Sequence, residues 1–158
     1  MNVQVDTNIL TRLAQMKHPH YIAACAAVGG LLSMGHKLCI VPQNLFEFWA
    51  VATRPEGENG LGMAVPDAKL EVERVKRSFV LLADSPALLN EWEHLVVAHN
   101  CKGKSSHDAR IIAAMITHGV DHLLTFNAGD FGRYANITVL DPAAVAAGTI
   151  APEQDVAE

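Results

Sequence analysis

The chain has 158 residues, a length typical of one compact domain. Half of its residues are hydrophobic and 18% are charged, which excludes an intrinsically disordered chain. The formal net charge of −5 disfavours a strongly basic protein that binds nucleic acid regardless of sequence, but it is compatible with an acidic site that recruits cations.

Cysteine content and hydropathy predict a reducing compartment and no membrane segment. Cys25, Cys39 and Cys101 form no Cys-x-x-Cys pair, which argues against a disulfide framework or a structural zinc site. The most hydrophobic stretch, 21–34, is shorter than the roughly 20 residues that span a bilayer. Asp6 interrupts the N-terminus before any signal-peptide pattern. We therefore expect a cytoplasmic protein.

Strands and helices are expected to alternate along the chain. Short hydrophobic runs predict strands at 2–5, 38–41, 79–83, 122–125 and 137–140. Longer periodic runs predict helices at 7–15, 21–33, 43–53, 67–78, 86–100 and 105–118. The glycine-containing stretch 54–65 is expected to be a mobile loop. This alternation predicts a single α/β domain over 1–147 with a mostly parallel sheet, followed by a frayed acidic tail at 148–158.

Acidic residues follow the predicted strands or open the helices after them. Asp6 directly follows the first strand, and Asn127 and Asp130 follow the strand at 122–125. Glu47 lies on the helix after the second strand, and Asp108 lies in the first turn of the helix at 105–118. Because sites in parallel sheets form beyond the carboxyl ends of the strands, these side chains are candidates for one common site.

Each of these residues also has an ordinary structural explanation. Asp6 suits a helix N-cap, and Glu47 suits a solvated helix face. Asp108 resembles the acid of a capping box that starts at Ser105. Asn127 suits an Asx-type turn.

The order of these acids favours a shared chemical role. Two unit charges ~4 Å apart repel by about 4 kcal/mol at an effective dielectric near 20, so a carboxylate cluster recruits a divalent cation or holds one acid protonated. Oxygen ligands favour Mg²⁺ or Mn²⁺, which bind phosphate oxygens and lower the pKa of bound water. We therefore predict hydrolysis of phosphodiester bonds, with Asp6, Glu47, Asp108 and Asp130 as catalytic and metal-binding acids.

Four motifs occur in a characteristic order over residues 2–142. They are Val-Asp-Thr-Asn-Ile-Leu at 5–10, the helical acid Glu47, His-Asp-Ala-Arg at 107–110, and Leu-Leu-Thr-Phe-Asn-x-x-Asp-Phe at 123–131. This ordered set resembles the PIN-domain ribonucleases, and most of all the VapC toxins of bacterial toxin–antitoxin pairs.

The resemblance implies a PIN-like three-layer fold and a Mg²⁺- or Mn²⁺-dependent endoribonuclease that leaves 3′-hydroxyl and 5′-phosphate ends. It also implies a homodimer that is inhibited by a VapB-like antitoxin, whose arm lies across the active-site groove.

The resemblance also assigns residue roles. Asp6 and Asp108 match metal ligands, and Glu47 matches the helical acid. The fourth acid of the family falls near Asn127, which is an amide here, so either Asp130 substitutes for it or a second metal binds weakly. The small polar residues that match supporting positions are Thr7, Asn8 and Ser106.

Positive charge near the acids is needed for RNA contact. Arg110 and Arg133 lie closest in sequence to the proposed ligands and are the preferred candidates, ahead of Arg54, Lys102 and Lys104.

Two other interpretations compete with the nuclease. A phosphatase of the haloacid-dehalogenase type would need an aspartate where Asn8 stands and a lysine later than Lys104. A PIN-like binding module with a decayed site is left open by the amide at Asn127.

Overall fold

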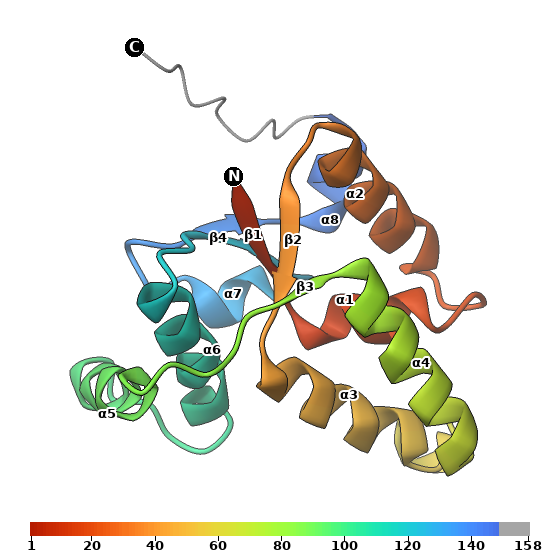
Figure 1. Ribbon diagram of the computed structural model, residues 1–158, viewed down its shortest axis with the longest axis horizontal. Coiled ribbons are helices and arrows are strands. Elements are labelled where there is room, and N and C mark those ends of the chain that lie inside the picture. The colour runs from red at the N-terminus through yellow and green to blue at the C-terminus, as the bar shows by residue number, and fades with distance from the viewer. Residues whose placement is uncertain (149–158) are drawn as a thin grey trace.

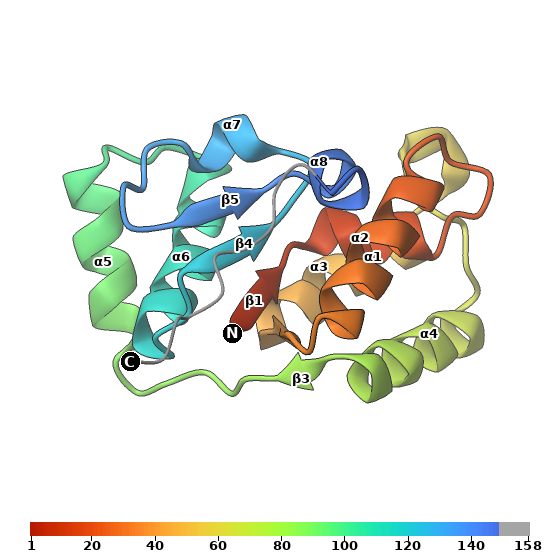
Figure 2. The ribbon, with the colours of Figure 1, turned by 90° about the horizontal axis from the view of Figure 1, so that it is seen from above.

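The computed structural model describes residues 1–148, so all of the expected acidic tail except Gly148 lies outside the described residues. A parallel five-stranded sheet with the order β3-β2-β1-β4-β5 forms the centre of this part (Figure 1). Its strands are β1 (Asn2–Val5), β2 (Lys37–Ile40), β3 (Val80–Leu81), β4 (His122–Leu124) and β5 (Thr138–Leu140). Figure 2 shows β1, β4 and β5 side by side. The prediction of an α/β fold with a parallel sheet is confirmed.

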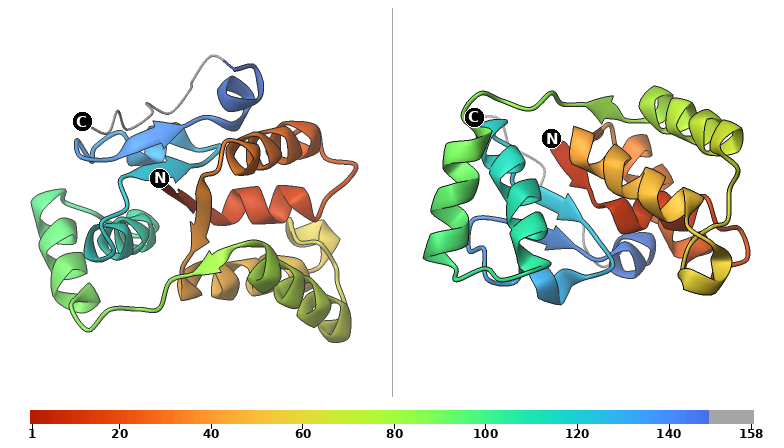
Figure 3. Two further views of the ribbon diagram at one scale, coloured as in Figure 1. Left: turned by 45° about the horizontal axis from the view of Figure 1, so that its top comes forward. Right: turned by 90° about the horizontal axis from the view of Figure 1, so that it is seen from below.

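Helices cover both faces of the sheet. They are α1 (Thr7–Leu13), α2 (Tyr21–Ser33), α3 (Pro42–Thr53), α4 (Val65–Ser78), α5 (Leu88–Ala98), α6 (Ser105–Thr117), α7 (Ala128–Phe131) and α8 (Pro142–Ala146). One core, which includes Leu31, Ile40 and Phe48, lies between the sheet and α1 to α4. A second core, which includes Ile112 and Leu123, lies between the sheet and α5 and α6. The two helical layers stay on opposite sides in every view of Figure 3.

The strand order places a crevice beside β1. The chain runs outward from β1 to β2 and β3, then crosses back to β4 on the other side of β1. Ligands of parallel sheets bind at the carboxyl ends of strands where the order reverses in this way. Val5 pairs with Leu124, and the Asp6 amide donates to the Leu124 carbonyl oxygen at 3.0 Å. The residues that directly follow β1 and β4 therefore lie side by side at the same edge of the sheet.

Several element boundaries differ from the sequence-based ones. The first helix ends at Leu13 instead of residue 15, and the helix expected at 67–78 begins at Val65, because Pro66 fits the first turn. The helix expected at 86–100 covers Leu88–Ala98, and Asn100 follows it with a left-handed φ of 48°. The third strand is shorter than expected, because only Val80 and Leu81 pair with β2. The short helices α7 and α8 were not expected.

The segment 54–65, expected as a mobile loop, contains a 3₁₀ turn at Glu56–Glu58 and folds back onto the end of α3. The Gly62 amide donates to the Arg54 carbonyl oxygen at 2.8 Å, and the Met63 amide donates to that of Ala52 at 2.8 Å. A Cβ atom at Gly60 would collide with the Arg54 backbone, so this close return of the chain requires glycine. Backbone hydrogen bonds therefore fasten the segment to α3.

Candidate active site

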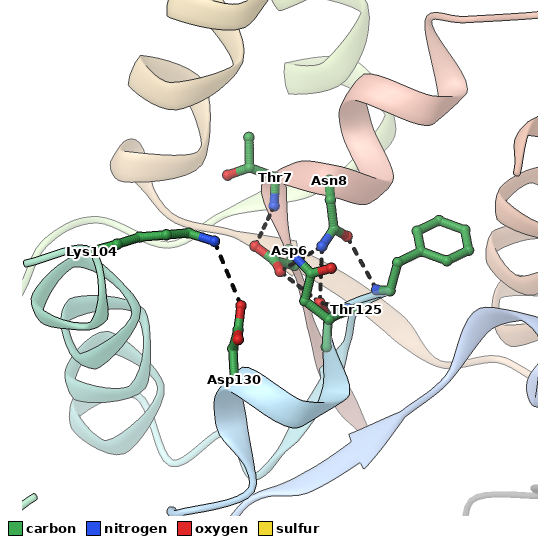
Figure 4. Close-up of polar contacts among 8 residues, drawn as sticks. Asp6, Thr7, Asn8, Lys104, Thr125 and Asp130 are labelled. Atoms are coloured by element: carbon green, nitrogen blue, oxygen red, sulfur yellow. Dashed lines mark hydrogen bonds and ion pairs between the residues drawn. The ribbon is translucent and has the colours of Figure 1, made fainter. Parts of the chain in front are cut away.

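Asp6 lies where β1 passes into α1, and neighbouring donors surround its carboxylate (Figure 4). The Thr7 amide donates to Asp6 Oδ1 at 2.7 Å, so Asp6 is the N-cap of α1 as expected. Asp6 Oδ2 accepts from Thr125 Oγ1 at 2.6 Å and from Asn8 Nδ2 at 3.0 Å. Burial raises the pKa of Asp6 to about 6, helped by the charges of two other carboxylates and opposed by the hydrogen bonds from Thr125 and Thr7. The two carboxylates are those of Glu47 and Asp108.

Glu47 is half-buried and lines the site, which corrects the interpretation as a solvated helix face. Its Oε2 accepts from Thr7 Oγ1 at 2.7 Å, and its Oε1 accepts from Gln43 Nε2 at 2.7 Å. Gln43 is only 5% exposed and also donates to the His107 carbonyl oxygen at 2.9 Å. This polar face of α3 is turned inward because α1 and α6 supply its hydrogen-bonding partners.

Asp108 lies in the first turn of α6, but the expected capping box is not formed. Ser105 Oγ instead accepts from the Lys102 amide at 2.8 Å and donates to the Lys102 carbonyl oxygen at 2.9 Å. Lys104 occupies the N-cap position without a side-chain cap. Burial raises the pKa of Asp108, and the charges of Asp130 and Glu47 act in the same direction. Asp108 therefore belongs to the same electrostatic cluster as Asp6 and Glu47.

Asn127 and Asp130 enter the site from α7, which replaces the expected Asx-type turn. Asn127 is the N-cap of α7 but makes no side-chain cap hydrogen bond. Asp130 pairs with Lys104, whose Nζ lies 3.6 Å from Asp130 Oδ2. Figure 4 shows these two side chains pointing toward one another from α6 and α7. A lysine thus partly neutralises the fourth acid.

All four predicted acids line one pocket of about 300 Å³. Thr7, Asn8 and Asn127 line it as well, as do the cations Arg54 and Lys104. Three predicted residues lie elsewhere. Ser106 and Arg110 line an adjoining pocket, and Arg133 donates to the His99 carbonyl oxygen at 3.3 Å.

The oxygen atoms of the pocket are the type of ligand that a hard divalent cation prefers, although their side chains do not converge on one position. Carboxylate and amide oxygens are the ligands that Mg²⁺ and Mn²⁺ prefer. Burial is the main cause of the raised pKa values of Asp6 and Asp108, and the neighbouring carboxylates add to it, so a bound cation would favour the ionised forms. Within residues 1–148, no three acidic, histidine or cysteine side chains are close enough to hold one ion as they stand.

A protein-family model, described as the PIN domain, matches residues 3–137. The chain belongs to the PIN domain family. No curated protein sequence matches it. Among residues 1–148, no helix is long and hydrophobic enough to cross a membrane.

Solved structures at low sequence identity share the PIN fold of this chain. VapBC2 from Rickettsia felis, bound to a DNA fragment from its promoter, has a TM-score of 0.64 and 16% identity, over 89% of this chain and 98% of that chain. A toxin–antitoxin complex from Klebsiella pneumoniae has a TM-score of 0.62 and 19% identity, over 89% and 97% of the two chains. VapC20 from Mycobacterium tuberculosis, a toxin that cleaves the sarcin–ricin loop, has a TM-score of 0.58 and 17% identity, over 77% and 86%.

Sequence reasoning assigned no role to two residues that shape the site of this PIN domain, Thr125 and Gln43. Thr125 is fully buried and binds Asp6, Asn8 and the Asn127 amide through one hydroxyl group. It directly follows β4, as Asp6 follows β1, but the strand predicted at 122–125 included Thr125, so the strand-end rule did not single it out. Gln43 begins the helix predicted at 43–53, and Lys104 was named as a candidate RNA contact but ranked below Arg110. The spacing of Gln43 and Glu47, four residues apart on one helix, could have predicted their contact, whereas the contact of Lys104 with Asp130 has no local sequence signal.

The raised pKa of Asp6 predicts how the stability of the metal-free PIN domain depends on pH. Because the folded-state pKa of about 6 exceeds the ordinary value of 3.8, ionisation of Asp6 destabilises the fold as pH rises from about 4 to 6. We expect Asp6→Asn to gain roughly 1–2 kcal/mol over the parent above pH 7, and to lose this advantage near pH 4. Urea unfolding in EDTA from pH 4 to 8 measures the difference.

Asp141→Asn is the matched control for this measurement. Asp141 also follows a strand and caps a helix, since its Oδ1 accepts from the Ala144 amide at 3.0 Å. This variant should show no gain that grows with pH. A clear loss of stability in Asp6→Asn at pH 7 would show that the carboxylate matters mainly as a helix cap.

Proposed function

We propose that this PIN domain is a metal-dependent endoribonuclease and the toxin of a type II toxin–antitoxin pair. The observation that carries the proposal is the single pocket at the reversal of strand order, where acids from four separate segments line one space. The similar structures described as VapBC and VapC support a VapB-like antitoxin partner, and VapC20 supports RNA as substrate. The family match favours a nuclease over a phosphatase of the haloacid-dehalogenase type.

Mg²⁺ or Mn²⁺ is the proposed cofactor. Asp6, Glu47 and Asp108 would hold the ion, and either Asp130 or Asn127 would complete its ligands. When bound, such an ion stabilises charge on phosphate oxygens and lowers the pKa of water.

The surrounding side chains orient the acids for this role. Thr125 and Asn8 fix Asp6 by donating to one carboxylate oxygen, while Thr7 and Gln43 each donate to a different oxygen of Glu47. These hydrogen bonds fix the orientation of both carboxylates.

Lys104 and Arg54 give the pocket a positive side. Both line it, and Lys104 reaches Asp130 at 3.6 Å. An RNA phosphate that approaches the acids would meet these cations, which offset part of the repulsion. Arg110 and Arg133 stay predicted RNA contacts, with Arg110 acting from the adjoining pocket. We further propose that the protein is cytoplasmic and forms a homodimer.

Cleavage of RNA by the purified chain tests this function. We expect cleavage of a 5′-labelled structured RNA in Mg²⁺ or Mn²⁺, loss of cleavage in EDTA, and products with 3′-hydroxyl and 5′-phosphate ends. Expression without a partner should arrest bacterial growth, and co-expression of a cognate antitoxin should restore it. Normal growth at high expression, together with no uptake of Mn²⁺ in a calorimetric titration, would identify a binding module with a decayed site.

A further inference from the structure

A second pocket adjoins the carboxylate pocket on the side of α5. It has a volume of about 430 Å³ and lies between α5 and the first turns of α6. Its lining residues are Leu88, Leu89, Trp92, Ser106, His107 and Arg110. His107 also lines the carboxylate pocket, so one side chain borders both spaces. The two pockets are therefore neighbours, and a single extended ligand can enter both.

The polar groups that border this second pocket are held in place. Trp92 Nε1 donates to the Ser106 carbonyl oxygen at 2.8 Å, which fixes the indole ring. Arg110 Nη2 contacts Asp84 Oδ2 at 2.8 Å, and Arg110 Nη1 donates to Gln43 Oε1 at 3.0 Å. Leu89, by contrast, is 61% exposed although it lines the pocket. The indole and the guanidinium group thus form walls that need little rearrangement when a ligand binds.

The chemistry of these walls suits a flat aromatic ring with a polar edge. Leu88 and Leu89 supply hydrophobic surface, and Trp92 and His107 supply rings on which a base can stack. Arg110 keeps guanidinium donors beyond the two already used, which can reach acceptors on the edge of a base. Because Asp84 balances the charge of Arg110, we expect the pocket to have little affinity for a phosphate group.

We propose that this pocket binds a nucleobase of the RNA substrate, at a nucleotide next to the phosphodiester held by the carboxylate pocket. The proposal rests on the proposed nuclease function and adds to it a site that selects the base. A phosphodiester at the acids brings its flanking base to the adjoining pocket at high effective concentration. That continuity through His107 favours a base over a side chain of a partner protein as the occupant.

The first test measures base binding without cleavage. The chain has two tryptophans, so Trp49→Phe leaves Trp92 as the fluorescent reporter. In EDTA we expect adenosine, guanosine, cytidine or uridine to change Trp92 fluorescence with saturation, and ribose to have no effect. Leu89→Asp should weaken nucleoside binding by roughly tenfold or more, because it replaces hydrophobic surface of the pocket with a charge that must be desolvated when the base binds. Val97→Asp is the matched control, because Val97 is 80% exposed on the same helix and does not line the pocket.

The second test asks whether the bound base belongs to the substrate. An RNA that the protein cleaves is scanned with single abasic positions. We expect one abasic position beside the cleaved bond to lower kcat/KM by about tenfold, and Leu89→Asp to cause no further loss on that substrate. Urea unfolding confirms that both aspartate variants remain folded.

The outcomes separate this proposal from the nuclease function. Cleavage that is equally fast at every abasic position, with no response of Trp92 to nucleosides, overturns the base pocket and leaves the nuclease standing. Absence of cleavage under all metal conditions overturns both. A change of oligomeric state in Leu89→Asp but not in Val97→Asp assigns the pocket to a protein interface and overturns the proposal.

Discussion

Asp6→Asn and Asp108→Asn are each expected to lower the rate of RNA cleavage by about a thousandfold or more. Each substitution removes a carboxylate charge from the pocket while keeping nearly the same shape. A divalent ion contributes several kcal/mol to the stabilisation of a phosphoryl transition state, and about 4 kcal/mol corresponds to a thousandfold change in rate. Single-turnover cleavage of a labelled RNA in Mg²⁺ measures the effect, and the circular dichroism spectrum establishes that the fold is kept.

Two controls separate this loss from a general effect of removing an acid. Asp141→Asn removes the carboxylate of another N-cap that follows a strand, at the start of α8. Asp67→Asn removes an exposed acid from the first turn of α4, as Asp108 is an acid in the first turn of α6. Both controls should cleave at the parent rate. If Asp6→Asn or Asp108→Asn also cleaves at the parent rate, that residue has no part in the mechanism.

Gln43→Met is expected to weaken Mn²⁺ binding by roughly 10- to 100-fold, although Gln43 is not a predicted ligand. Gln43 is buried between Glu47 and Arg110, donating to the first at 2.7 Å and accepting from the second at 3.0 Å. Methionine has a similar volume but cannot hold the Glu47 carboxylate. The hydrogen bonds lost from buried groups should also lower the free energy of unfolding by about 2–3 kcal/mol. Calorimetric titration with Mn²⁺, well below the melting temperature, measures the affinity.

A matched control and a second background test whether Gln43 acts through Glu47. Gln15→Met breaks a similar contact outside the pocket, where Arg12 Nη1 donates to Gln15 Oε1 at 2.7 Å, and should leave Mn²⁺ affinity unchanged. In a Glu47→Ala background, Gln43→Met should cause little further loss of affinity. An undiminished loss in that background would give Gln43 a purely structural role.

The sequence predicted the architecture well because hydrophobic periodicity reports directly on which residues face a core. The spacing of Phe48 and Ala52 on α3, both fully buried, is one example. The exposed side of the same helix was harder to interpret. Phe46 is 67% exposed whereas the polar Gln43 is buried, which reverses the simple division into a hydrophobic and a solvated face. Hydrogen-bonding partners from α1 and α6 make that reversal possible, and periodicity does not record them.

Boundaries and caps were predicted less well, because they depend on competition between neighbouring groups. Ser105 could have capped α6, but its hydroxyl group bonds to the Lys102 backbone, which leaves the Asp108 carboxylate in the pocket. The segment 54–65 has the composition of a mobile loop, yet its amides find carbonyl partners at the end of α3.

By itself, the sequence determined where the acids stand relative to their own strands and helices, since that depends only on near neighbours along the chain. Which side chains hold those acids was decided by the tertiary structure. Thr125 reaches Asp6 across 119 residues of sequence, and Arg110 reaches Gln43 across 67. These contacts exist because the sheet places β4 beside β1 and thereby brings α6 to α3. A hydrogen bond acts only over about 3 Å, so no pattern of neighbouring residues could have specified them.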